Sequence, residues 1–255
     1  MDAPYLVIIP TYNEIQNIQI LLDRILQIPF KLNVLVIDDS SPDGTGQIVR
    51  QLAKSNEHIE LHSRHRKEGV ASAFLFGLSF AIEYDFKWAI CMDSDLSHRV
   101  EDLEALLNYT LNFPEASLVI GSRYVSGGKV TNVSRYRRLL SQLGNYISRL
   151  SMGTNLMDVT GGFRAYNVQK LKSIHFGDFS TKGYGFQMQL IDSILKHEGI
   201  IHEMPIDFMP RLYGKSKLTL RVALSALFTV GSIGWNRVLS SVFQGQKSNN
   251  KTLSS

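Results

Sequence analysis

The sequence predicts an α/β fold in which a mostly parallel central sheet is flanked by helices. In the N-terminal part, short apolar runs alternate with longer segments whose apolar residues recur at helical spacing. Several of these runs are continuous and rich in β-branched residues, a pattern typical of strands buried on both faces. Polar or acidic turns follow the runs, as expected where parallel strands end in a functional edge.

The elements of the first half follow in order from this pattern. Strands are expected at residues 6–9, 32–37, 59–61 and around Cys91, each short and apolar. Pro10 ends the first strand, and the polar segment that follows it opens a helix with apolar residues from Ile15 to Ile25. The turn at 38–45 leads into a second helix, and the basic segment 64–69 precedes an apolar helix that reaches about Tyr84.

The second half continues the alternation and then changes character. A helix at 101–112 and a strand at 118–120 are followed by a basic amphipathic stretch at 129–152, which separates them from a glycine-rich segment at 158–164. A helix is expected at 187–196, a strand at 200–208 and a basic loop at 211–217. We assign one domain to residues 1–217, an apolar or amphipathic helix that could associate with a membrane to 218–243, and a disordered polar tail to 244–255.

Composition narrows the class of protein. With 255 residues, 44% apolar and 20% charged, the chain can bury a substantial core. A single cysteine excludes an internal disulfide framework and suits a reducing compartment. No secretory signal is visible, and the apolar stretch 222–235 is too short to span a bilayer. The formal net charge of +4 mildly favours an anionic partner.

The strand that contains Cys91 ends in Asp93-Ser94-Asp95, two carboxylates one residue apart. At the carboxyl end of a strand such a pair offers hard oxygen ligands, which suit Mg²⁺ or Mn²⁺ better than zinc. The second aspartate would hold the cation, and the first would lie near the sugar or ribose of a nucleotide. The alternative is an Asx-rich turn without a ligand.

Two further polar turns, at 10–14 and 38–43, follow neighbouring strands and together indicate a nucleotide site. No G-x-G-x-x-G or Walker-type motif is present, so dinucleotide and P-loop folds lose their main support. Tyr12 could stack on a base, and Glu14 or Asp39 could accept hydrogen bonds from it. Arg123, Arg211 and Lys217 could neutralise a diphosphate. Packing of Tyr12 on the sheet rim and a solvated charged face are the simpler alternatives.

Seven motifs carry a resemblance to a known family. Residues 7–14 (VIIPTYNE), 38–45 (DDSSPDGT) and 93–98 (DSDLSH) resemble, in order and spacing, the family 2 glycosyltransferases. Residues 121–124 (GSRY), 158–166 (DVTGGFRAY), 182–187 (KGYGFQ) and 211–217 (RLYGKSK) resemble the dolichyl or polyprenyl phosphate mannose synthases within it. The resemblance covers about residues 5–220.

The resemblance implies a GT-A fold and inverting transfer of mannose from GDP-mannose to a polyprenyl (dolichyl-type) phosphate, with Mg²⁺ or Mn²⁺ as cofactor. Its catalytic residues would be Asp93, Asp95 and Arg123, and its metal ligands Asp93, Asp95 and Ser97. The acceptor phosphate would contact Arg123, Arg138 and Ser141. The nucleotide sugar would be bound by Pro10, Tyr12, Glu14, Ile37, Asp39, Asp93, Ser94, Asp95, Arg211 and Lys217.

The chain departs from the family pattern at several positions. Ser94 replaces the usual alanine, Arg99-Val100 replaces Pro-Pro, and Gln189 stands where relatives commonly carry glutamate. An acceptor phosphate is already ionised at neutral pH, so a missing general base need not abolish activity. Sugar transfer from a UDP donor and a catalytically inactive binding subunit stay open as alternatives. A phospho-receiver domain is disfavoured because it would need the acidic pair on the first strand and a much shorter chain.

The expected location is the cytoplasmic face of a membrane, to which the protein would bind peripherally. The acceptor phosphate lies at a bilayer surface, and residues 135–152 and 220–243 have the amphipathic character needed to dock on an anionic leaflet. The alternative is that both helices cover the sheet, in which case a separate membrane subunit would bring the enzyme to its lipid. Nucleic acid is not expected as a partner.

Overall fold

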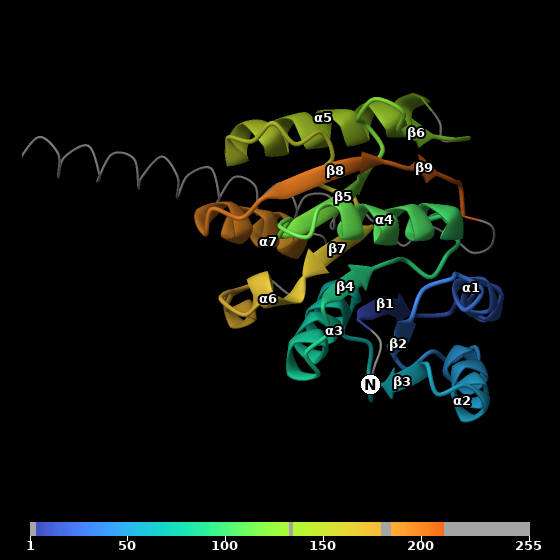
Figure 1. Cartoon of the computed structure of the whole chain (residues 1–255). Coiled ribbons are helices and arrows are strands. Elements are labelled where there is room, and N and C mark those ends of the chain that lie inside the picture. Colours follow the sequence, from blue (N-terminus) through green and yellow to red (C-terminus); the bar gives the residue numbers. More distant parts are fainter. Residues whose placement is uncertain (1–3, 133–134, 180–184, 212–255) are drawn as a thin grey trace, which may run out of the picture.

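A seven-stranded sheet with the order β3-β2-β1-β4-β7-β5-β8 forms the centre of the molecule (Figure 1). The computed structural model describes residues 4–132, 135–179 and 185–211. All neighbouring strands are parallel except β7, which is antiparallel to both β4 and β5. The strands are β1 (Tyr5–Thr11), β2 (Leu32–Asp38), β3 (Ile59–Ser63), β4 (Trp88–Cys91), β5 (Leu118–Ser122), β7 (Arg164–Asn167) and β8 (Ile201–Pro205).

Two short strands form a second, two-stranded sheet. β6 (Lys129–Val130) pairs in parallel with β9 (Asp207–Phe208). The helices are α1 (Ile18–Ile25), α2 (Thr45–Ser55), α3 (Val70–Glu83), α4 (Val100–Asn112), α5 (Arg135–Met152), α6 (Val168–Leu171) and α7 (Gly185–Lys196), with a 3-10 turn at Phe176–Asp178. This architecture confirms the predicted α/β class with a mostly parallel sheet.

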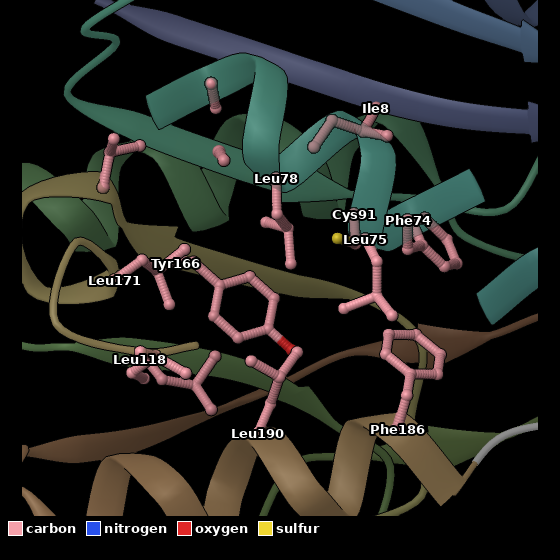
Figure 2. Close-up of a cluster of buried hydrophobic side chains, with 14 of the residues drawn as sticks. Ile8, Phe74, Leu75, Leu78, Cys91, Leu118, Tyr166, Leu171, Phe186 and Leu190 are labelled. Carbon is pink, nitrogen blue, oxygen red and sulfur yellow. The ribbon is translucent and has the colours of Figure 1, made fainter. Parts of the chain in front are cut away.

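Two hydrophobic cores lie on the two faces of the sheet, and β1 contributes alternate residues to each. Leu6 and Ile8 join the core that contains residues of α3 and α7, whereas Val7 and Ile9 join the core that contains residues of α1 and α4. Figure 2 shows part of the first core, where Ile8 lies among side chains of α3. Because both faces are covered, β1 needs apolar residues at every position, as the continuous run predicted.

Gly77 allows α3 to lie close against β1. A Cβ atom at this position would lie 2.4 Å from Cγ2 of Ile8, closer than any normal contact. The short apolar side chains of α3, such as Ala73 and Ala81, are likewise buried in the core. The sheet therefore packs against a helix that is apolar around most of its circumference.

The structure corrects several predicted boundaries. The helix expected to include Ile15 begins only at Ile18, and Ile15 itself is 39% exposed. The strand expected at 200–208 is divided into β8 and β9. Strand β7 was not predicted, although all four of its residues are buried. It is short, follows a Gly-Gly pair and begins with the charged Arg164, so its sequence lacks the pattern of a buried strand. Residues 218–243 and 244–255 lie outside the described residues.

Candidate active site

Loops from distant parts of the sequence meet at the carboxyl edge of the parallel strands. The ends of β1 and β2 are in register, so that Thr11 lies opposite Asp38. Strand β7 runs in the opposite direction, and its first residue, Arg164, pairs with Cys91 of β4 and Ile120 of β5. The loop before β7 is therefore placed at the same edge as the turns that follow β4 and β5.

Three turns at this edge contain a non-glycine residue with a left-handed backbone. These are Asn13 after β1, Ser40 after β2 and Leu96 after β4, with φ angles of 56°, 58° and 62°. Such conformations cost free energy outside glycine and concentrate at functional sites, where surrounding contacts hold them. Three of the six non-glycine residues with a positive φ in the described part of the chain thus lie at this edge, which supports its choice as the candidate site.

The turn after β2 is held by a buried carboxylate. Asp38 Oδ1 accepts a hydrogen bond from the Thr11 hydroxyl at 2.8 Å, and Asp38 Oδ2 accepts one from the backbone N–H of Ser41 at 3.0 Å. Glu14, predicted to bind the nucleotide, is also buried and accepts a hydrogen bond from the Asn17 amide at 2.8 Å. Both carboxylates therefore stabilise the turns at this edge. The Glu14 side chain does so through its hydrogen bond with Asn17, the residue just before α1.

Asp39 and Tyr12 face the basic loop 64–69. Asp39 pairs with Arg64 at 2.9 Å, with both side chains 6% exposed, and it accepts the backbone N–H of Gly69 at 2.7 Å. The ammonium of Lys67 lies 3.7 Å from the centroid of the half-buried Tyr12 ring. Asp39 thus fixes this loop beside the position where a base would stack.

Ile37 was also predicted to bind the nucleotide, and its side chain is fully buried in the core on one face of the sheet. A contact between Ile37 and a nucleotide at the edge would therefore come from its backbone. Pro10 is half-buried at the end of β1, and its carbonyl oxygen accepts a hydrogen bond from the Ser94 hydroxyl at 3.0 Å. Ser94 therefore ties the turn after β4 to the end of β1.

The turn after β4 presents both predicted metal-binding aspartates. Asp95 is almost fully buried, and its Oδ1 accepts hydrogen bonds from the backbone N–H and the hydroxyl of Ser97. Its Oδ2 pairs with Nε of Arg211 at 2.8 Å. Asp93 is more open, with 29% of its side chain exposed, and its Oδ2 lies 3.5 Å from Nε2 of His98.

The donor set fits a hard divalent cation that also binds the substrate. Asp93, Asp95 and Ser97 offer only oxygen atoms, the ligands that Mg²⁺ and Mn²⁺ prefer. Among residues 4–132, 135–179 and 185–211, no group of three His, Cys, Asp or Glu residues could hold a metal alone. A cation here would need further oxygens from a diphosphate or water, as is usual for Mg²⁺ at phosphate-transfer sites.

The pKa of Asp93 is lowered although this carboxyl is partly buried. Burial opposes ionisation of this carboxyl, but the His98 imidazole and the positive charges of Arg211 and Arg123 outweigh that effect. The two arginines act on one carboxylate from segments that are far apart in the sequence. Two guanidinium groups thus act at the position of Asp93, as suits a site for a cation-bound diphosphate.

Arg123 is held by a buried carboxylate. Its Nε and Nη2 donate to the two carboxylate oxygens of Asp158 at 2.7 and 2.8 Å, and Nη2 also donates to the Thr160 hydroxyl at 3.0 Å. Burial opposes ionisation of Asp158, yet the charge and hydrogen bonds of Arg123 keep its pKa low. The guanidinium lies over the rings of Tyr124 and Phe208, at 5.2 and 5.5 Å from their centroids. These contacts within the protein therefore fix the orientation of the Arg123 guanidinium.

The loop 157–162 is held by residues that the sequence analysis did not assign to the site. Glu203 on β8 accepts the backbone N–H groups of residues 157 and 158, and Asn145 on α5 accepts those of residues 159 and 160. Arg164, fully buried, donates to the carbonyls of residues 159, 161 and 187. The glycine-rich motif marked this loop, but only the tertiary contacts show what holds it.

The remaining predicted residues lie at the edge of this cluster or beyond it. Ser141 on α5 accepts a hydrogen bond from the Tyr124 hydroxyl at 2.9 Å, which links this helix to the neighbour of Arg123. Arg138, one turn earlier on α5, is exposed. Gln187 at the start of α7 is buried, and its amide can donate to the carbonyls of Thr160 and Gly161 at 3.2 Å each. Lys217 lies outside the described residues.

Two curated proteins are similar along most of the chain. The undecaprenyl-phosphate mannosyltransferase of Micrococcus luteus is 36% identical over 225 residues, which cover 88% of this chain and 91% of that protein. The polyprenol monophosphomannose synthase of Mycolicibacterium smegmatis is 36% identical over 230 residues, covering 90% and 86% respectively.

Solved structures share the fold at low sequence identity. The glucosyl-3-phosphoglycerate synthase of Mycobacterium tuberculosis, in complex with Mn²⁺, UDP-glucose and phosphoglyceric acid, matches with a TM-score of 0.66 and 18% identity, covering 91% of this chain and 80% of that chain. The mannosyltransferase PcManGT of Pyrobaculum calidifontis, in complex with GDP-Man and Mn²⁺, matches with a TM-score of 0.56 and 19% identity, covering 85% and 59% respectively. The fold is therefore the GT-A fold implied by the resemblance.

The family assignment follows from the sequence itself. Residues 6–174 match the family model described as Glycosyl transferase family 2. This span contains the turns after β1, β2, β4 and β5 and the loop before β7, which together form the candidate site. The chain belongs to glycosyl transferase family 2.

Proposed function

We propose that this protein transfers mannose from GDP-mannose to a polyprenyl phosphate and inverts the sugar linkage to the β form. The observation that carries the proposal is the grouping of Asp93 and Asp95 with Arg211 and Arg123 at one sheet edge. Two carboxylates and two guanidinium groups suit a cation-bound diphosphate donor and a phosphate acceptor. The two relatives that are 36% identical over nearly the full chain support mannose and a polyprenyl phosphate as the substrates.

The donor would occupy the edge formed by the turns after β1, β2 and β4. Tyr12 would stack on the base, and Asp39 would accept hydrogen bonds from the base while still paired with Arg64. Asp93, Asp95 and Ser97 would hold Mg²⁺ or Mn²⁺ together with the diphosphate. When bound, this ion would neutralise negative charge on the leaving nucleotide. Arg211 and Lys217 would provide further positive charge to the same diphosphate.

The acceptor phosphate would be bound by Arg123, Arg138 and Ser141. An oxygen of this phosphate attacks the anomeric carbon of the sugar, and the bond between that carbon and the diphosphate oxygen breaks. The phosphate oxygen is already ionised at neutral pH, so the attack needs no strong general base. Arg123, fixed by Asp158 and Thr160, would orient the nucleophile, so that catalysis depends mainly on positioning and electrostatics.

A membrane surface is the proposed location of the acceptor, and α5 is the proposed contact with it. Five large apolar side chains of this helix are exposed, at the helical spacing of a single face. They are Leu139 (65% exposed), Leu143 (52%), Tyr146 (56%), Ile147 (38%) and Leu150 (65%). No helix among residues 4–132, 135–179 and 185–211 is long and apolar enough to cross a bilayer. From the exposed apolar face of α5 we propose peripheral binding to an anionic cytoplasmic leaflet.

The experiment is a donor panel scored by lipid-linked product. Purified protein, Mn²⁺ and a short-chain polyprenyl phosphate are incubated in turn with GDP-mannose, UDP-glucose and UDP-GlcNAc. A mannolipid formed from GDP-mannose alone is the expected result. Product from a UDP-sugar alone would overturn the choice of donor. Binding of GDP without turnover of any donor would instead indicate a catalytically inactive binding subunit.

A further inference from the structure

A histidine at the end of the metal-binding turn occupies an unusual position. The His98 side chain is 3% exposed. Its ring stacks on Phe163 at a centroid distance of 5.0 Å and an interplanar angle of 18°, and it meets the edge of Phe208 at 5.3 Å and 68°. The plane of the imidazole is therefore fixed by two aromatic residues from different segments.

The two ring nitrogens of His98 are buried and make no hydrogen bond of ordinary geometry with any residue that the structure describes. Burial of such groups costs stability, and an apolar ring of similar size would fill the same space without that cost. Nε2 of His98 lies 3.5 Å from Oδ2 of the Asp93 carboxylate. This separation is at the outer limit of a hydrogen bond.

The surrounding contacts connect this imidazole to the segments that position Arg123 and Arg211. Phe163 ends the loop that holds Asp158 and therefore Arg123. Phe208 lies under the Arg123 guanidinium, and the next residue donates its backbone N–H to the Ser97 carbonyl at 3.0 Å. Two residues later, Arg211 pairs with Asp95. His98 thus stands where the acidic turn meets the two arginine-bearing segments.

We infer that His98 is a positioning residue whose Nε2–H donates to Asp93 Oδ2 and fixes this carboxylate for the cation and the donor. The inference rests on the proposed function. Hydrogen bonds of catalytic groups tighten in the complex with substrate, so we expect the 3.5 Å contact to shorten when the donor and the cation bind. Partners that orient a metal-binding group in this way typically change metal affinity or activity by about 10- to 100-fold.

The test separates the hydrogen bond from the stacking. His98→Phe keeps an aromatic ring between Phe163 and Phe208 but removes the donor, whereas His98→Gln places an amide donor near Nε2 without the ring. His202→Phe is the control, because His202 contacts the Phe113 ring at 4.8 Å and the Tyr109 hydroxyl at 3.2 Å, on a strand, β8, that β7 and β5 separate from β4. Calorimetry measures GDP binding with and without Mn²⁺, and thermal melting reports folding.

The expected result is that His98→Phe melts at or above the wild-type temperature but binds GDP about 10- to 100-fold more weakly in the presence of Mn²⁺. Its binding of GDP without Mn²⁺ stays unchanged. His98→Gln recovers part of the Mn²⁺-dependent binding, and His202→Phe behaves as wild type. Mn²⁺-dependent GDP binding by His98→Phe at the wild-type level would overturn the inference.

If the variants do not fold, a measurement on the wild-type protein still tests whether His98 donates to Asp93. Nitrogen-15 NMR of labelled histidine shows which ring nitrogen of His98 is protonated. A proton on Nε2 is expected, and a proton on Nδ1 with a bare Nε2 would exclude the donation to Asp93. This readout needs no ligand. If the wild type lacks Mn²⁺-dependent GDP binding, the proposed function fails while the tautomer still tests the contact.

Discussion

At the scale of single residues, the candidate site consists of charges that are paired before substrate arrives. Asp95 holds Arg211, Asp158 holds Arg123, and Asp39 holds Arg64. A buried charge without a partner is costly, so these pairs stabilise the folded site. They also explain why each arginine is available in one fixed orientation, as a phosphate site requires.

Replacement of Asp95 by alanine should reduce turnover by more than about 100-fold, since even residues outside the first layer of a metal site change activity by 10- to 100-fold. Asp85→Ala is the control, because Asp85 is an exposed acid whose carboxylate pairs with Lys172 away from the site. Initial rates with GDP-mannose and Mn²⁺ measure the effect. Near-normal turnover of the Asp95 variant, or full wild-type activity in EDTA, would contradict the proposed cation role.

Replacement of Asp158 by asparagine should lower the free energy of unfolding at neutral pH by about 3 kcal/mol, because the change breaks a buried ion pair. The folded-state pKa of Asp158 lies below its ordinary value of 3.8. Its stabilisation is therefore complete above pH values near the unfolded pKa and is lost as the pH falls through the lower folded pKa.

Urea unfolding at several pH values checks this prediction. The difference between wild type and Asp158→Asn should be largest at neutral pH and should shrink in acid. Asp85→Asn serves as the control, and little change is expected because its ion pair is exposed. A difference in stability that does not vary with pH would show that the ionised carboxylate is not the source of the stabilisation.

At the scale of elements, the spacing between α3 and β1 depends on one glycine. In Gly77→Ala the new methyl group would clash with Ile8, and we expect a loss of about 1–3 kcal/mol in unfolding free energy, as for other overpacked cores. Gly144→Ala on α5 is the matched control, because a Cβ there meets no atom within 4 Å. It should stabilise the helix by up to about 1 kcal/mol. Equal effects of both changes in urea unfolding would refute the close approach of α3 to β1.

At the scale of the whole molecule, the exposed face of α5 and the net charge of +4 predict binding to anionic vesicles. Each basic residue near such a surface adds about 1 kcal/mol, and salt weakens this attraction. We expect the protein to sediment with anionic liposomes at low ionic strength and to dissociate in part as salt increases. The triple change of Leu139, Leu143 and Leu150 to asparagine should reduce sedimentation.

Leu111→Asn provides the control for this experiment, because Leu111 is 54% exposed on α4. It should leave sedimentation unchanged. Trp235 lies outside the described residues, and a blue shift of its fluorescence on liposomes would show that the second predicted segment, 220–243, also inserts. Absence of liposome binding at low salt would mean that a membrane partner subunit brings the enzyme to its lipid.

The sequence alone determined the fold class and the location of most site loops. Continuous apolar runs such as 6–9 and 32–37 indicate strands that are buried on both faces, and the polar turns after them indicate the edge where a ligand binds. The local sequence pattern was therefore sufficient to predict the fold class and these loops. The prediction of Asp93, Asp95 and Arg123 rested on this logic, and the structure brings these residues together.

Only the tertiary structure decided which partner each charge has. Strand β7 is four residues long and contains Arg164, so its antiparallel insertion depends on pairing with β4 and β5, which lie far away in sequence. That insertion places Asp158 against Arg123 and Phe163 against His98. Local pattern reports burial and turn chemistry, whereas contacts between distant segments depend on how the whole chain packs, and the latter fix the geometry of this site.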